Sequence, residues 1–69
     1  MVGNKFEAPH NGLGVGDKVT ISGVSGTWVI KHLGNTALGE YVAAKKLDDA
    51  GNETSQFLPD VDPKDCTRA

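Results

Sequence analysis

Hydrophobic and polar residues alternate along a segment that follows a Gly-Asp pair near the start of the chain. Val19 and Ile21 are apolar, and the residues around them are polar. Because successive side chains of a strand point to opposite faces, this run predicts a strand over 17–22 with both apolar residues facing inward. A loop holding Gly23 and Gly26 follows, and β-branched and aromatic residues then resume. The pattern is typical of two antiparallel strands joined by a short loop.

The second predicted strand, over 26–33, is apolar on both of its faces. A period of two places on one face the side chains of Trp28, Ile30 and His32. The other face carries those of Val29, Lys31 and Leu33. Such a strand either lies in the middle of a closed barrel or presents an apolar binding surface. Trp28 decides between the two interpretations, because a buried Trp28 would leave little of a binding face here.

Two more strands are predicted from short segments bounded by turns. The segment 40–47 contains helix-favouring residues, but it is short and begins with Tyr41-Val42, so we predict a strand. A turn rich in Asp, Gly and Asn follows at 48–52. The last strand is expected over 53–58, ended by Pro59.

The connections and the end of the chain show further local signals. Glycines bound a predicted loop over 34–39, in which Leu38 is expected to fold back as a plug. Near the C-terminus, Asp62 is expected to cap a turn or one short helical turn that has Pro63 at its first position. The terminal pair Arg68-Ala69 is expected to fray.

Length and composition indicate one small all-β domain. The chain has 69 residues, with nine glycines and three prolines, which suits a small barrel of four to five antiparallel strands with many turns. We expect a flexible N-terminal arm over 1–14, tethered at Phe6, and a single domain over 15–69. A deep substrate pocket would remove apolar material that so short a chain needs for its core, so we expect no enzyme.

Charge and cysteine content point to an ordinary intracellular surface. Residues 1–47 carry five lysines against three carboxylates, and residues 48–69 carry two basic residues against six carboxylates, which gives a net charge of −2. This balance is not that of a strongly basic nucleic-acid binder. Cys66 is the single cysteine and has no disulfide partner. We find no membrane-spanning apolar run and no signal-peptide core, so a cytoplasmic location is expected.

The residues that could carry chemistry do not form a recognised catalytic or metal pattern. His10 and His32 lie in different segments and lack the spacing of zinc ligands. The acidic residues around Gly51 lack the calcium-loop pattern, and the serines have no credible His–Asp arrangement. We therefore expect no catalytic residue, no metal and no cofactor.

The remaining candidate site combines aromatic and basic residues on neighbouring predicted strands. Its candidate binding residues are Trp28, Lys31, Tyr41, Lys45 and Lys46. Aromatic rings interleaved with lysines can stack bases and hold phosphates, or can clamp a proline-rich peptide or a methylated cation. The competing interpretation is that Trp28, and also Phe57 on the next strand, belong to the core.

The stretch from Gly16-Asp17-Lys18-Val19 through Gly23 and Gly26 to Trp28-Val29-Ile30 resembles SH3-like small barrels of the KOW and Tudor type. The resemblance covers 16–58 as an order of strands, with residue matches confined to 16–30. It implies a five-stranded barrel that binds nucleic acid or protein without catalysis. The acidic balance departs from a typical KOW RNA-binder, and the aromatic residues do not reproduce an ordered cage.

Three functions stay open, and the first is favoured. The chain is expected to be a protein-interaction module, as part of an assembly or as a regulator. The alternatives are a nucleic-acid binder that uses the same aromatic and basic face, and a structural protein of a phage or mobile element. Salt-sensitive oligonucleotide binding would indicate the second, and oligomerisation would indicate the third. The sequence leaves the oligomeric state open.

Overall fold

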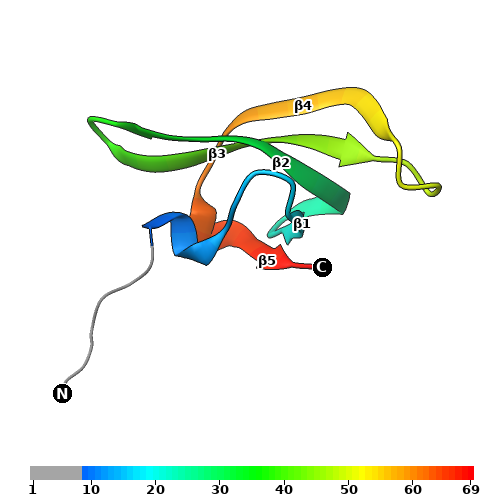
Figure 1. The fold of residues 1–69 in the computed structure, drawn as a ribbon, viewed down its shortest axis with the longest axis horizontal. Coiled ribbons are helices and arrows are strands. Elements are labelled where there is room, and N and C mark those ends of the chain that lie inside the picture. Colours follow the sequence, from blue (N-terminus) through cyan, green and yellow to red (C-terminus); the bar gives the residue numbers. More distant parts are fainter. Residues whose placement is uncertain (1–8) are drawn as a thin grey trace, which may run out of the picture.

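The computed structural model describes residues 9–69, and the predicted tether at Phe6 lies outside this part of the chain. Five strands form one antiparallel sheet in the order β4-β3-β2-β1-β5 (Figure 1). The strands are β1 (Lys18–Ile21), β2 (Val24–Thr36), β3 (Gly39–Leu47), β4 (Glu53–Val61) and β5 (Cys66–Arg68). Two short 3-10 turns, η1 (Pro9–Gly12) and η2 (Pro63–Asp65), complete the described elements. The prediction of an all-β protein is therefore confirmed, although the sheet is open between its edge strands β4 and β5.

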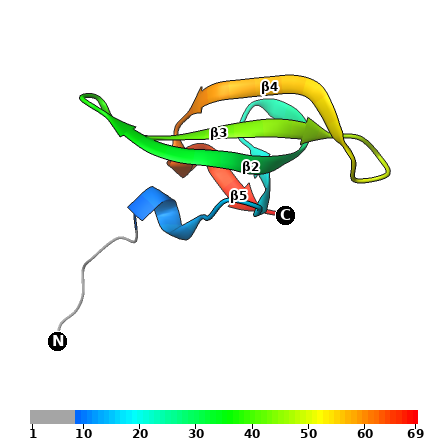
Figure 2. The same ribbon diagram turned by 45° about the horizontal axis from the view of Figure 1, so that its top comes forward.

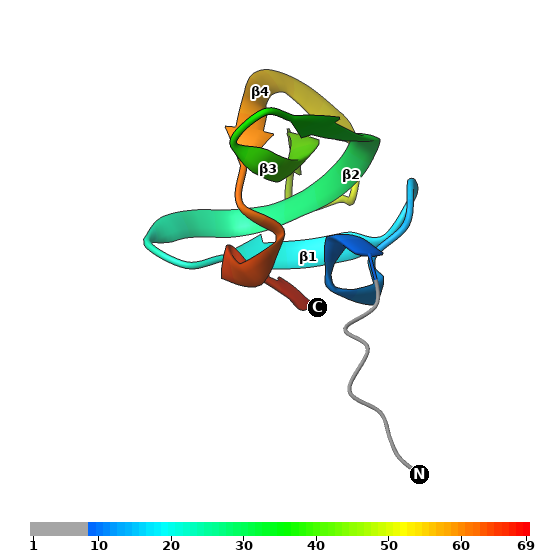
Figure 3. The ribbon, with the colours of Figure 1, turned by 90° about the vertical axis from the view of Figure 1, so that its left-hand side faces the viewer.

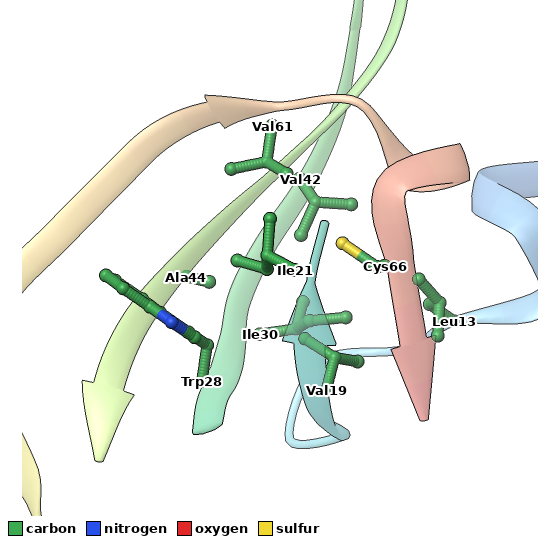
Figure 4. Packing of buried hydrophobic residues seen from close by; sticks show 9 residues of the cluster. All are labelled: Leu13, Val19, Ile21, Trp28, Ile30, Val42, Ala44, Val61 and Cys66. Atoms are coloured by element: carbon green, nitrogen blue, oxygen red, sulfur yellow. The ribbon is translucent and has the colours of Figure 1, made fainter. Parts of the chain in front are cut away.

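The sheet curls so that its two halves cover a common core. Strands β2, β3 and β4 lie side by side as one layer, and β1 and β5 lie beneath it (Figures 2 and 3). The side chains between these layers belong to Leu13, Val19, Ile21, Trp28, Ile30, Val42, Ala44, Val61 and Cys66 (Figure 4). Val19 and Ile21 point inward as predicted, and Val19 is fully buried. Burial of these apolar side chains supplies the main stabilisation of so small a sheet.

The hairpin of β2 and β3 is longer than the glycine pattern predicts. Strand β2 continues through Gly34 to Thr36, so the predicted loop over 34–39 shrinks to Ala37 and Leu38. Gly39 has a φ of +126°, which permits the chain to reverse this sharply. Leu38 is 99% exposed, so the predicted plug is wrong.

Strand β4 continues past Pro59, where the sequence pattern predicted its end. The strand lies at the edge of the sheet and extends to Val61. A proline is tolerated on an edge strand because a missing N–H on the solvent side breaks no ladder hydrogen bond. The pairing of β3 with β4 also contains two register irregularities, so this edge of the sheet is not a regular ladder.

The C-terminal segment forms the other edge of the sheet. Asp62 caps η2 as predicted, since its Oδ1 accepts the Lys64 N–H at 3.0 Å, and Pro63 stands at the first position. Strand β5 then pairs with β1, and the Ala69 N–H donates to the Lys18 carbonyl at 2.9 Å. The predicted fraying of Arg68-Ala69 is wrong, because this pairing holds both residues.

The described residues before β1 are held against the sheet. His10 and Asn11 have positive φ angles, and the His10 ring Nε2 lies 2.8 Å from the Gly34 carbonyl oxygen. Leu13 joins the core, and the Arg68 guanidinium donates to the Gly12 carbonyl at 2.7 Å. In the described part of the chain, no helix has the length and apolar character needed to cross a membrane.

Candidate functional site

The strand register separates the predicted site residues onto two faces of the sheet. Directly paired residues of neighbouring strands point to the same face. Lys46 pairs with Trp28, whereas Lys45 pairs with Val29 and with Phe57. Trp28 and Lys46 therefore lie on the core side, and Lys45 lies on the opposite side.

Trp28 belongs to the core rather than to a binding surface. Its side chain is 3% exposed, and its indole N–H donates to the Ser25 carbonyl at 3.1 Å. Figure 4 shows the ring beside Ala44, at one end of the apolar cluster. An indole is the largest apolar group available to this short chain, and its single polar atom finds a backbone partner. The binding role considered for Trp28 on the basis of its two-sided strand is not supported.

The Lys46 side chain lies over the first residues of strand β2. A Cβ atom built on Gly26 would lie 2.6 Å from the Lys46 Cε, so the aliphatic stem of the lysine occupies the space that a side chain would need. Lysine stems commonly cover apolar surface in this way while the ammonium group stays in water. Lys46 is half-buried and does not join Lys45 on the other face.

A β-bulge in β2 changes the direction of the side chains after Ile30. Ile30 pairs with Ala44 and His32 pairs with Ala43, so β2 contains one extra residue, Lys31. Lys31 and His32 are both exposed as a result. The predicted alignment of His32 with Trp28 and Ile30 is wrong, because the bulge turns His32 to the other face.

Tyr41 lies across Gly34 on this other face. The two residues are directly paired, and a Cβ atom on Gly34 would lie 2.5 Å from atoms of the Tyr41 ring. The Tyr41 and His32 rings are 5.9 Å apart between centroids and tilted by 44°. Because Gly34 has no side chain, the Tyr41 ring can pack against its backbone and lie beside the His32 ring.

We define the outer face as the side of β2, β3 and β4 that is turned away from the core, together with the side of β1 that the strand register places in phase with it. The register places Lys18, Val29, His32, Tyr41, Lys45 and Phe57 on it, and Lys31, the exposed bulge residue between Ile30 and His32, is included with them. Three of the five predicted binding residues are in this set. The other four were not among the predicted binding residues, and only the strand register places them on this face. Neither the sequence neighbours of Phe57 nor the apolar character of Val29 indicates a place on the outer face.

Phe57 is an exposed aromatic side chain of the outer face. It is 47% exposed, so the interpretation that places it in the core is wrong. It lies in line with Lys45, Val29 and Lys18 across four strands. In this row Phe57 stands at the end beside Lys45, and Val29 stands between Lys45 and Lys18.

The outer face carries a net positive charge. Lys31 donates to Glu53 at 2.8 Å, and this hydrogen bond lowers the pKa of Glu53, helped by the positive charges of Lys31 and Lys45. Within residues 9–69, Lys18 and Lys45 make no ion pair. Two lysines of the row therefore retain uncompensated charge.

Cys66 is placed as a structural residue. It is buried, and its Sγ lies 3.9 Å from the Asp62 carbonyl oxygen. Burial raises the pKa of the thiol, and the negative charges of Asp65 and Asp62 raise it further. A thiol with a raised pKa is a poor nucleophile. Within residues 9–69, no three metal-ligating side chains gather at one place.

Comparisons of the chain with models of known protein families, with curated proteins and with solved structures find no match. The functional assignment therefore rests on the geometry and chemistry of the outer face.

Proposed function

We propose that this chain is a small non-catalytic binding domain of the SH3-like barrel type whose outer face binds a protein partner. Support for the barrel class comes from a curled five-stranded antiparallel sheet in which the first and last strands are neighbours. The Gly16-Asp17 pair leads directly into β1, as the resemblance requires.

The observation that carries the proposal is the exposure of Phe57, which pairs with Lys45 at the edge of the outer face. Full burial of a phenylalanine contributes about 1.5–3 kcal/mol, and a domain of this size has few such groups to leave in water. The nine residues of the core cluster close the interior without Phe57. An aromatic side chain left out of the core beside a lysine is suited to docking on another surface.

The charge of the outer face favours a protein over a nucleic acid. Among the described lysines of the outer face, Lys18 and Lys45 have no ion-pair partner, whereas Lys31 is paired with Glu53. Nucleic-acid binding draws its affinity from many phosphate contacts, which two such lysines do not provide. An exposed aromatic and a half-buried aliphatic side chain that alternate with two lysines suit a protein surface of mixed polarity, because lysine stems can pack against apolar groups while their ammonium groups stay in water.

The proposal can be tested with peptides selected from a random display library on the immobilised wild-type protein. Addition of a selected peptide should shift the amide resonances of Val29, His32, Tyr41 and Lys45 together. Phe57→Ser should weaken binding by at least about tenfold, which corresponds to about 1.4 kcal/mol. Val15→Ser, at an apolar position 66% exposed outside the outer face, is the matched control and should bind like wild type.

Shifts confined to the acidic residues 60–65, or unchanged binding by the Phe57 variant, would count against the outer face. Oligonucleotides provide the competing arm. If they bind with steep salt dependence and Lys45→Glu abolishes that binding, the partner is a nucleic acid instead.

A further inference from the structure

The turn between β2 and β3, which we call the tip, exposes a leucine completely. It consists of Ala37 and Leu38 and lies at one end of the longest axis, away from β1 and β5 (Figure 1). Leu38 is 99% exposed. Nothing in the turn geometry requires leucine, because the positive φ falls on Gly39, and short turns ordinarily carry polar residues or glycine.

The tip is held in a defined shape. The Thr36 hydroxyl accepts the Leu38 N–H at 3.1 Å and donates to the Gly39 carbonyl at 3.3 Å. The paired strands continue directly up to Thr36 and Gly39. An apolar side chain presented on a pre-ordered turn loses little conformational entropy when it binds.

Carboxylates surround the base of the tip. A cleft of about 350 Å³ between the tip, η1 and η2 is lined in part by Leu38, Glu40 and Asp62. A second cleft of about 310 Å³ is lined in part by Asp60 and Tyr41. Of the described residues that line the two clefts, Lys64 is the single cation. This end of the molecule therefore combines an apolar projection with a net negative charge.

The two surfaces complement each other in both charge and polarity. The tip presents an apolar side chain near carboxylates, and the outer face presents Phe57 beside Lys45 and Val29 between Lys45 and Lys18. We infer that a second copy of this chain is a partner of the outer face, with Leu38 of one copy packed against Phe57 of the next. This inference rests on the proposed binding role of the outer face.

The contact joins two different surfaces, so it is heterologous. Each copy in such a pair still has one unused tip or one unused outer face, and addition can continue into a ring or an open chain. The predicted alternative of a structural protein that assembles from many copies agrees with this geometry. Opposite charges across the contact make it sensitive to salt.

The test uses sedimentation of the full chain and three matched serine variants. The wild-type mass should rise above the 7.2 kDa of one chain as concentration increases. Leu38→Ser and Phe57→Ser should each weaken association at least about tenfold. The control Val15→Ser should associate like wild type. All three positions are exposed, and the tip and outer-face changes leave the core cluster untouched.

Mixing the two defective variants gives the sharpest result. Leu38→Ser retains an intact outer face and Phe57→Ser retains an intact tip, so the mixture should form a one-to-one heterodimer that grows no further. In that mixture, isotope-labelled Leu38→Ser should show shifted resonances on the outer face. Labelled Phe57→Ser should show them at the tip.

The inference is overturned if the wild-type protein stays monomeric up to about 1 mM. A dissociation constant of that size corresponds to a free energy of association of about −4 kcal/mol. A mixture without heterodimers overturns it as well. If the wild type is monomeric but Phe57→Ser still loses the selected peptides, only the self-association fails. If neither self-association nor peptide binding depends on Phe57, the proposed function fails with it.

Discussion

Trp28, a candidate binding residue, lies in the core, and Phe57, a candidate core residue, lies on the surface. Trp28 sits on a strand with apolar residues on both faces, yet its ring lies in the core and its N–H is satisfied by Ser25. Phe57 sits among polar residues on an edge strand and remains half exposed. At the scale of single residues, one aromatic group therefore stabilises the fold and the other is available for binding.

Replacing Trp28 by phenylalanine should destabilise the protein without altering the outer face directly. The variant loses a buried hydrogen bond and part of the indole volume, so we expect the free energy of unfolding to fall by about 1–3 kcal/mol. Urea unfolding followed by far-ultraviolet circular dichroism measures this loss. Leu38→Ser is the control and should change stability by less than about 0.5 kcal/mol. An unchanged stability of Trp28→Phe would contradict the core position of Trp28.

At the scale of elements, the β2–β3 hairpin organises the outer face. The bulge at Lys31 turns His32 outward, and Gly34 leaves room for the ring of Tyr41. Without the bulge, His32 would keep the phase of Trp28 and Ile30. One extra residue in one strand thus brings the histidine and the tyrosine together.

Gly34→Ala should disturb this arrangement selectively. The new methyl group would meet the Tyr41 ring at 2.5 Å, so the ring must move away from the Gly34 backbone. We expect a loss of stability of about 1–3 kcal/mol, as for other over-packed sites, and altered resonances of the His32 ring. The control is Gly14→Ala, whose new methyl group would meet only the Asp17 carboxylate at 3.9 Å. Equal stability and equal His32 resonances in both variants would show that Tyr41 does not lie on Gly34.

At the scale of the whole molecule, long-range polar contacts tie the two ends of the described chain together. Arg68 of β5 donates to the Asp17 carboxylate at 2.9 Å and to the Gly12 carbonyl. The hydrogen bond from the Gly14 N–H and then that from Arg68 lower the pKa of Asp17. These contacts connect the segment before β1 with the last strand of the sheet.

Stability should fall in acid, and Asp17 should contribute to that fall. Because the pKa of Asp17 is lower in the folded protein than in the unfolded chain, the unfolded chain binds the proton more readily. The contribution is present at neutral pH, above the unfolded pKa, and is lost as the pH falls through the folded pKa. Urea midpoints measured from neutral to strongly acidic pH should show a smaller decrease for Asp17→Asn than for wild type. The control is Asp49→Asn, at an exposed position outside both ion pairs. If the urea midpoints of Asp17→Asn and Asp49→Asn depend on pH in the same way, Asp17 does not contribute to the loss of stability in acid.

Features that depend on neighbouring residues could be predicted from the sequence. The alternation around Val19 and Ile21 determined β1 and its inward side chains. Asp62 and Pro63 determined the short capped turn before β5, and the run 48–52 determined the turn between β3 and β4. Each of these signals acts within a few residues, through side-chain direction, capping or backbone preference.

The tertiary structure decided how those elements are paired, and with it the candidate site. Phe57 is exposed because its pairing with Lys45 places it on the outer face, and Pro59 is tolerated because β4 is an edge strand. Lys31 forms a bulge only because β2 pairs with β3 in one particular register. Pairing depends on contacts between residues far apart in the chain, whereas the alternation along one strand is compatible with several registers. The sequence by itself therefore determined the all-β character and the turns, and the long-range pairing determined which aromatic and basic side chains share a face.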